Sequence, residues 1–296
     1  MKTAISRKKR KETRDGWLFL LPFIILVSIF FIYPALDAFY LSFHKYSLLS
    51  TQSEFVGIHN YLNAFHDSVF IRALLNTLGL MVIAVPLQLI IALCLAMIVN
   101  SRIRGKSFYR TAYFLPYVTS VVAIAIIFMF LFKDGGIVNS IIELLGLHSI
   151  SFFNNTHWAL PLVGIMVIWE FMGFYMIIFL AGLQNIQQSL YEAAEIDGAN
   201  KWQQLINVTL PQLKPTIFFN LIISMSTTAA LYGLVVVISK GKGGPLNSTM
   251  TILLYIVNTA FDDFQMGYAC AQGIILFIIL FSLTIISKFI FKEETD

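Results

Sequence analysis

The chain is 296 residues long, and 58% of its residues are hydrophobic while 12% are charged, with a formal net charge of +4 at pH 7. Because about a quarter of the residues in an ordinary soluble domain are charged, this composition excludes such a domain and indicates a membrane protein. The two cysteines lie inside apolar runs and the five histidines lack the spacing of metal ligands, so neither a disulfide framework nor a metal site is predicted.

The first segment, residues 1–16, is a basic arm. A nucleic acid could bind such an arm, but an apolar run begins directly after it at Trp17, so we interpret the arm as a topology signal held in the cytoplasm. The apolar run covers residues 17–42 and is longer than the ~7–15 residues of a signal-peptide core. It is therefore predicted to be a first, uncleaved membrane span.

Five further apolar runs each approach the ~20 residues that a helix needs to cross the hydrocarbon core. They cover about residues 75–100, 112–132, 158–183, 216–239 and 267–291. The sequence thus predicts an all-α fold, a polytopic membrane protein in which residues 17–296 form one domain with six transmembrane helices. With both termini in the cytoplasm, fifteen lysine and arginine residues lie inside and five outside, which agrees with the positive-inside rule.

The fourth predicted span carries an acid, Glu170, near its middle. An acid at the bilayer centre costs ~2.5 kcal/mol or more on insertion scales, so Glu170 is expected to face a polar cavity or another subunit. Two interpretations stay open: Glu170 hydrogen-bonds the hydroxyls of a substrate, or it pairs with a donor on a partner. Phe174 lies one helical turn further on and could stack on a sugar ring.

The fifth predicted span carries polar side chains spaced four, three, one and four residues apart, which places them on one helical stripe. They are Asn220, Ser224, Thr227, Thr228 and Tyr232. Serine and threonine can instead satisfy their own backbone in a membrane helix, and this accounts for most such residues taken singly. A stripe of five favours a substrate path.

A polar segment, residues 184–215, separates the fourth and fifth spans and is expected in the cytoplasm. A turn at Asp197-Gly198 divides it into two short helices. Asn200 and Gln203 have the spacing of a capping box, so the second helix is expected to begin directly after Asn200.

The second helix is amphipathic, with Trp202, Leu205 and Ile206 on one face. We expect it to stop at Pro211. Its face could cover the ends of the spans as a solvated loop, or it could receive a partner protein.

The same segment carries a known motif. Its residues are Glu192-Ala193-Ala194, then Gly198, then Val208-x-Leu210-Pro211. This pattern resembles the EAA signature of the permease subunits of binding-protein-dependent ABC importers, although Val208 and Leu205 stand where the family usually has isoleucine and phenylalanine. The likeness continues through FVGIHNYLNAF, Asn76-Thr77 and KGKGGPLNST, and it is greatest to the carbohydrate-importing branch.

The resemblance implies the type I permease fold of ABC importers and one half of a permease heterodimer, multi-pass in a bacterial or archaeal cytoplasmic membrane with both termini in the cytoplasm. The expected partners are a second permease subunit, two ABC ATPase subunits and an extracytoplasmic sugar-binding protein. The chain is not expected to be an enzyme or to hold a cofactor. It lacks G-x-x-x-x-G-K-[ST], so ATP and Mg would be bound by the partner ATPases.

The motif that carries the resemblance implies which residues couple transport to the ATPase. They are Glu192, Ala193, Ala194, Asp197, Gly198, Trp202, Leu210 and Pro211. The substrate path is expected, from the residue types and spacing described above, to include Glu170, Phe174 and the five polar residues of the fifth span. The expected cargo is a sugar, an oligosaccharide in particular.

Two alternatives remain. One is an ABC importer of a non-sugar solute. The other is an ion-coupled carrier with Glu170 as its proton site, which would need an inverted repeat and broken helices; the EAA motif argues against it.

Overall fold

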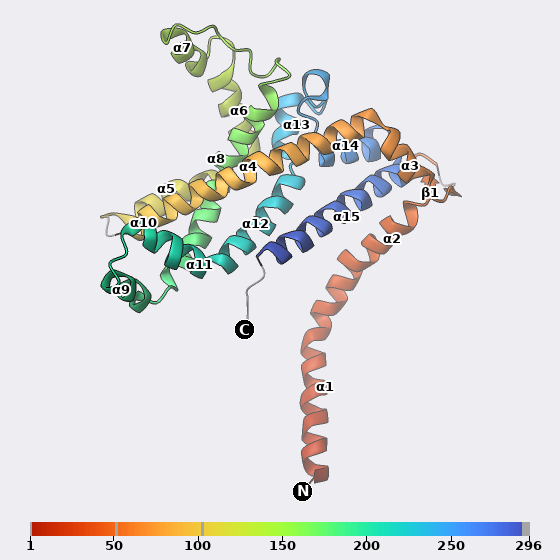
Figure 1. Cartoon of the computed structure of the whole chain (residues 1–296). Helices are drawn as coiled ribbons and strands as arrows, with labels where there is room; N and C mark the ends of the chain where they lie inside the picture. The colour runs from red at the N-terminus through yellow and green to blue at the C-terminus, as the bar shows by residue number, and fades with distance from the viewer. Residues whose placement is uncertain (1, 51–52, 102–103, 292–296) are drawn as a thin grey trace. The chain divides into compact units, whose positions relative to one another are not determined.

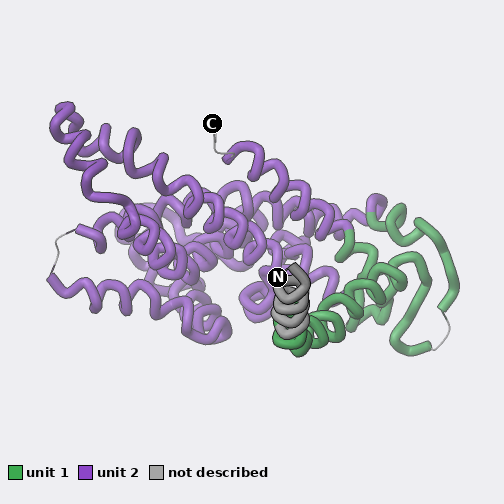
Figure 2. Tube along the Cα trace, turned by 90° about the horizontal axis from the view of Figure 1, so that it is seen from below, with its two compact units in different colours: residues 1–64, 259–274 green, residues 65–258, 275–296 purple. Residues whose placement is uncertain are grey.

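The computed structural model describes residues 2–50, 53–101 and 104–291, except for the side chains of residues 2–12, 14 and 15. Most of this is helical (Figure 1). The chain divides into two compact units, Met1–Ala64 with Thr259–Ile274, and Phe65–Asn258 with Ile275–Asp296 (Figure 2). The predicted topology counts some charges that lie outside the described part of the chain. These are the charges of Arg102, Lys292 and most of the basic arm.

The first unit starts with one long helical segment. It consists of α1 Lys2–Val27, a π-helical turn Ser28–Ile32 and α2 Tyr33–Leu41. Residues Gly16–Leu41 are apolar enough to cross a membrane, and none of their most apolar window is buried within the chain. These side chains therefore require lipid or a partner protein around them.

A small hairpin and a short helix follow this segment. Strands β1 His44–Tyr46 and β2 Ser53–Phe55 pair antiparallel, with His44 opposite Phe55, and α3 spans His59–His66. The amide Nδ2 of Asn60 donates to the carbonyl oxygens of Ser42 and His44 at 2.9 and 3.0 Å. Because a satisfied buried amide fixes the two chains it joins, Asn60 fastens α3 to the hairpin.

The second unit holds most of the remaining helices. In chain order they are α4 Ser68–Asn100, α5 Lys106–Val118, α6 Val121–Phe132, α7 Ile137–Leu144, α8 Ala159–Gln184, α9 Gln188–Ile196, α10 Lys201–Gln204, α11 Leu210–Gln212, α12 Lys214–Ala229, α13 Gly233–Ser239 and α14 Ile252–Val257. The last helix, α15 Met266–Ile290, begins in the first unit and ends in the second. Asp67 caps α4, since its Oδ1 accepts from the backbone N–H groups of Val69 and Phe70 at 2.9 and 3.1 Å.

Six segments of the described residues are long and apolar enough to cross a membrane. They are Gly16–Leu41, Ser68–Asn100, Val121–Leu144, Ala159–Gln184, Lys214–Ser239 and Met266–Ile290. The prediction of an all-α membrane protein with six transmembrane helices is confirmed. The short apolar helix Ile252–Asp262 was not predicted from the sequence.

The third predicted span, residues 112–132, is not one helix. It is divided between α5 and α6, because Thr119 is extended with φ −78° and ψ 148°. The break follows Pro116, whose ring cannot fit a continuing helix interior without freeing a carbonyl group. The hydroxyl of Thr119 donates to the carbonyl of Leu115 at 2.8 Å, which satisfies one group that the break leaves open.

The fifth predicted span, residues 216–239, is broken as well. Helix α12 ends at Ala229 and α13 begins at Gly233, with Tyr232 between them at φ −132° and ψ −63°. The carbonyl of Leu231 at this break accepts a hydrogen bond of 2.7 Å from the hydroxyl of Thr251. The break is therefore stabilised from a segment twenty residues further along the chain.

The core of the second unit lies where α4, α8 and α12 pack together. Large α8 side chains such as Tyr175 and Phe179 are buried there with the small α4 residues Ala92 and Ala96. On the other side of α8, a Cβ at Gly173 would collide with the backbone carbonyl of Tyr113 on α5. Small residues at these contacts allow the helix backbones to approach closely, as is usual in membranes.

Candidate functional site

The loop between α8 and α12 forms a helix, a turn and a second helix. Helix α9 ends before Gly198, which has φ +78°, a left-handed conformation that favours glycine. The capping box is present: Asn200 Oδ1 accepts from the N–H of Gln203 at 3.0 Å, and Gln203 Oε1 accepts from the N–H of Asn200 at 2.8 Å. The predicted turn and the predicted start of the second helix are confirmed.

The predicted stop at Pro211 is wrong. The second helix continues as a π-helical turn, Leu205–Thr209, and then as α11, where Pro211 occupies one of the first two positions. Because Pro211 has no N–H, it leaves a carbonyl of the preceding π-helical turn without its helical partner, and the helix ends one residue later at Gln212. Only Leu213, which is fully buried, separates α11 from α12.

Polar contacts hold the two helices of the loop together. The hydroxyls of Tyr191 and Thr209 are 3.0 Å apart, and Lys201 Nζ donates to Glu195 Oε1 at 2.9 Å. The hydrogen bond from Lys201 lowers the pKa of the Glu195 carboxyl below its usual value. The loop is therefore a folded helical pair rather than a flexible connection.

The outer face of this pair is apolar and exposed. Ile196 is 86%, Trp202 67% and Ile206 45% exposed. Of the predicted coupling residues, Glu192, Ala193, Asp197, Gly198, Trp202 and Pro211 are exposed, and Ala194 and Leu210 are half-buried. Figure 1 shows α9, α10 and α11 gathered beyond the ends of α8 and α12. Within the described chain nothing covers this face, so it is available to another protein.

In α8, Glu170 is 9% exposed, and among the described residues no side chain donates a hydrogen bond to it. Phe174, one turn further, stacks on Tyr117 of α5 with ring centroids 4.6 Å apart. The two predicted path residues of α8 thus lie in different surroundings, one an unpaired acid and the other part of an aromatic pair.

The polar residues of α12 are only partly arranged as predicted. Asn220, Ser224 and Thr228 are 0–1% exposed and face into the chain. Tyr232 is wrongly included in the stripe, because the helix is broken before it. The hydroxyls of Thr227 and Thr228 both donate to the carbonyl of Ser224, at 3.0 and 2.8 Å, as serine and threonine commonly do in membrane helices.

Two residues that the sequence reasoning missed complete this region. The Nε2 of Gln88 on α4 donates to the hydroxyl of Ser224, and the Tyr175 hydroxyl lies 3.0 Å from that of Thr227. Gln88 Oε1 and both amide atoms of Asn220 are buried with no hydrogen-bond partner among the described residues. A glutamine inside the long apolar run of α4 was the signal that could have identified this site.

The glycine-rich segment after α13 is fastened to α4. The Nδ2 of Asn76 donates to the carbonyl oxygens of Asn247 and Met250 at 2.9 and 3.0 Å, and Thr77 Oγ1 accepts from the N–H of Ile252 at 2.9 Å. Gly243 and Gly244 both have positive φ, which allows the chain to turn back. Asn76-Thr77 and this segment, two of the resembling motifs, therefore form one structural unit.

Residues 84–293 match the family described as binding-protein-dependent transport system inner membrane component. The chain belongs to this family. Among curated proteins, the lactose transport system permease protein LacF of Rhizobium radiobacter is 37% identical over 296 residues, which is 99% of each chain. The family model thus matches residues 84–293, and the similarity to this relative extends over the first span as well.

Solved structures agree with membership of the binding-protein-dependent family. One, of a bacterial ABC transporter involved in the import of the acidic polysaccharide alginate, is 25% identical with a TM-score of 0.81 and covers 98% of this chain and 100% of that chain. The other, of the alginate transporter in complex with an alginate pentasaccharide-bound periplasmic protein, is 26% identical with a TM-score of 0.80 and covers 96% of both chains. Permeases of this family work with a substrate-binding protein.

Proposed function

We propose that this chain is the permease subunit of an ABC importer that carries a saccharide, an oligosaccharide in particular, across the cytoplasmic membrane. The observation that carries this is similarity over the full length to a lactose permease, combined with a fold that matches an alginate importer. The known cargoes of these relatives are a neutral disaccharide and an acidic polysaccharide, so a carbohydrate is the class they share.

The helical pair α9–α11 is proposed to receive an ATPase subunit. The exposed apolar face around Ile196 and Trp202 supports this proposal, because a partner protein that covers the face would shield it from water. The positive φ of Gly198 would set the angle between the two helices. The chain itself would hold no cofactor, and two partner ATPases would bind ATP and Mg.

A second permease subunit is proposed to pack against this chain in the membrane. The most apolar window of Gly16–Leu41 is not buried against any described part of the chain, and no described residue donates a hydrogen bond to Glu170. A second permease subunit packed against this chain would account for both features. Both termini and the α9–α11 pair would then lie in the cytoplasm, and the hairpin β1–β2 outside.

The substrate path is proposed to include Glu170 and Phe174, with Thr227 and Tyr232 contributing from the fifth span. Of the α12 residues, Thr227 and Tyr232 are partly exposed, whereas Asn220, Ser224 and Thr228 are buried in the chain and would require α12 to move before they met a substrate.

An ion-coupled carrier remains the contrasting function. Broken helices, which such carriers use, are present between α5 and α6 and between α12 and α13. Membership of the binding-protein-dependent family nevertheless favours an ATP-driven importer. Proteoliposomes holding the complete importer separate the two. ATP inside should drive uptake of labelled lactose in the presence of the binding protein, while uptake driven by a proton gradient without ATP would contradict the proposal.

A further inference from the structure

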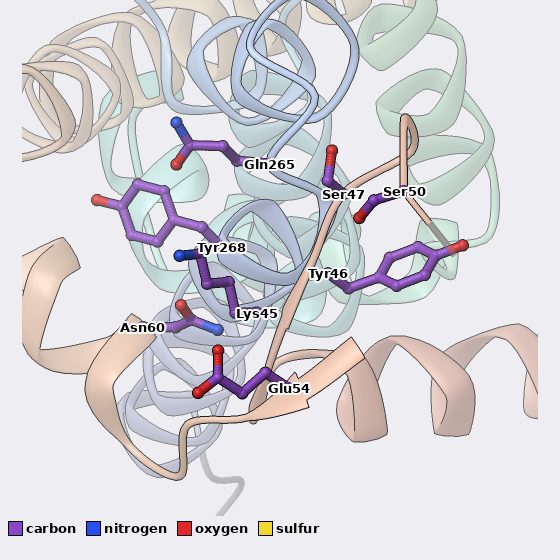
Figure 3. A pocket seen from close by; sticks show the side chains of 8 residues that line it. All are labelled: Lys45, Tyr46, Ser47, Ser50, Glu54, Asn60, Gln265 and Tyr268. Atoms are coloured by element: carbon purple, nitrogen blue, oxygen red, sulfur yellow. The ribbon is translucent and has the colours of Figure 1, made fainter. Parts of the chain in front are cut away.

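A polar pocket of about 520 Å³ lies in the first unit (Figure 3). Its walls are formed by Lys45, Tyr46, Ser47, Ser50, Glu54, Asn60, Gln265 and Tyr268. All eight residues belong to the same compact unit. Small-molecule sites usually enclose about 300–1,000 Å³ and combine aromatic walls with a few fixed polar groups, so this pocket has the size and composition of a ligand site.

The backbone fixes the polar groups of this pocket. Lys45 and Glu54 are directly opposite each other in the hairpin, which places both side chains on one face. The Nδ2 of Asn60 is held by two backbone carbonyl groups, at 2.9 and 3.0 Å, so its Oδ1 has a fixed direction. A ligand would meet groups whose positions are largely set before it binds.

The two charged side chains of the pocket do not pair with each other. Within the described chain neither Lys45 nor Glu54 forms an ion pair, although both line the same pocket. Figure 3 shows their charged ends on the side of the pocket where the Asn60 amide lies, while the ring of Tyr46 turns away from them. The pocket therefore offers an ammonium donor and a carboxylate acceptor together with the ring of Tyr268.

We propose that this pocket binds one neutral pyranose ring of a saccharide, as a receiving site separate from the path through the spans. The inference rests on the proposed function. Neighbouring hydroxyls of a pyranose can donate to Glu54 and accept from Lys45 at once, and charge-assisted bonds of this kind are roughly twice as strong as neutral ones. The ring of Tyr268 offers an apolar surface to the carbon face of the sugar. An acidic sugar has a carboxylate in place of the hydroxyl at carbon six, so it loses a donor to Glu54 and meets a like charge there, and it should bind less tightly than a neutral sugar.

The test uses the complete permease and ATPase complex in nanodiscs, without its binding protein. Galactose and galacturonate, which differ only by a carboxylate at carbon six, are titrated and followed by saturation-transfer NMR. Glu54→Gln and Lys45→Met alter exposed side chains, so folding is not at risk, and Glu143→Gln changes an equally exposed acid on α7 as a matched control.

Galactose should bind the wild type and bind more tightly than galacturonate. Each pocket variant should weaken galactose binding by about tenfold or more, since a hydrogen bond to a charged group is worth about 1.5–3 kcal/mol. The control should bind galactose like the wild type. Galactose affinity that is equal in the wild type and in Glu54→Gln, or a preference for galacturonate, would overturn the inference.

Binding of a protein side chain in this pocket, instead of a sugar, would give a different result. If Glu54→Gln leaves sugar binding absent or unchanged but weakens capture of the sugar-binding protein, the pocket receives a protein side chain and the inference is wrong. Normal ATP-driven uptake of saccharides without galactose binding at the pocket contradicts this inference alone. Failure of the wild-type complex to take up any saccharide contradicts the proposed function instead.

Discussion

The side-chain amide of Gln88 on α4 donates to the hydroxyl of Ser224 on α12, a contact between residues 136 positions apart in sequence. Next to it, one helical turn away on α12, Asn220 is fully buried and neither of its amide atoms has a partner among the described residues. A buried amide left unpaired costs about 1–3 kcal/mol. The interface of α4 and α12 therefore holds a buried hydrogen bond between side chains and, beside it, a polar group that destabilises the fold.

Asn220→Leu should accordingly raise the midpoint of thermal unfolding, because leucine removes the unpaired amide at similar volume. Asn139→Leu is the matched control: Asn139 is also 0% exposed, but its amide makes three hydrogen bonds to Lys133 and Ile150. The control should lower the midpoint. Unfolding of the purified protein in detergent measures both, and an equal loss in the two variants would mean that Asn220 has a buried partner.

Gly198→Ala should reduce coupling. A Cβ at Gly198 meets no atom within 4 Å, so the whole effect comes from the positive φ, which costs an alanine about 1–2 kcal/mol. A cost of that size shifts the population of the docking conformation about five- to thirty-fold. Saccharide uptake and sugar-stimulated ATP hydrolysis should fall together in the reconstituted importer, and less in Gly198→Asn, since asparagine tolerates this conformation.

Gly146→Ala provides the control for backbone strain alone. Gly146 also has positive φ and open space around it, but it follows α7, which Figure 1 shows well separated from the α9–α11 pair. Coupling that falls as far in Gly146→Ala as in Gly198→Ala would show a general effect of strain on the membrane domain.

The contact between Glu195 and Lys201 should depend on pH. The hydrogen bond from Lys201 lowers the pKa of Glu195 from its usual 4.5, so its stabilising contribution is present above that value and is lost as pH falls through the lowered pKa. In NMR of protein with carbon-13 in its glutamate carboxyls, Glu195 should titrate below the usual value of a glutamate. Lys201→Met should raise the titration midpoint of Glu195 towards the usual value. An unchanged midpoint would mean that Glu195 and Lys201 do not form an ion pair in solution.

Topology can be tested after Cys94 and Cys270 are replaced by serine. Cysteine at the exposed position Ser53 should react with an external, membrane-impermeant thiol reagent, whereas cysteine at the equally exposed Ser107 and Asn200 should not. Permeabilised cells, in which all three should react, control for accessibility. Labelling of Asn200→Cys in intact cells would place the α9–α11 pair outside and refute the proposed docking of an ATPase.

Glu170→Gln should change which saccharides are taken up while the permease pair still assembles. The substitution keeps the shape of the side chain and removes its charge, so substrate contacts that accept from two hydroxyls are weakened first. Competition of unlabelled sugars against labelled lactose measures selectivity, and co-purification measures assembly. Loss of the second permease subunit with unchanged selectivity would instead assign Glu170 to the subunit interface.

The sequence was sufficient for features set within a few residues. The capping box of Asn200 and Gln203 and the turn at Gly198 depend on local backbone conformation, and the six spans depend on apolar length alone. The breaks after Val118 and Ala229 were missed because hydrophobicity continues across them, so no window distinguishes one helix from two. The inward orientation of Asn220 and the contact of Gln88 depend on which helices pack together, and helical spacing carries no information on that.

The first unit is assembled from two ends of the chain. The N–H of Leu48 donates to the carbonyl of Phe264 at 3.4 Å, and Gly267 lies so close to the carbonyl of His44 that no side chain fits. Synthesis adds about 5–20 residues per second, so Phe264 and Gly267 are made about 10–40 s after the hairpin. During this interval the first unit lacks the residues that complete it. The amino-terminal segment would then be more accessible to a quality-control protease or an insertion chaperone than the finished protein is.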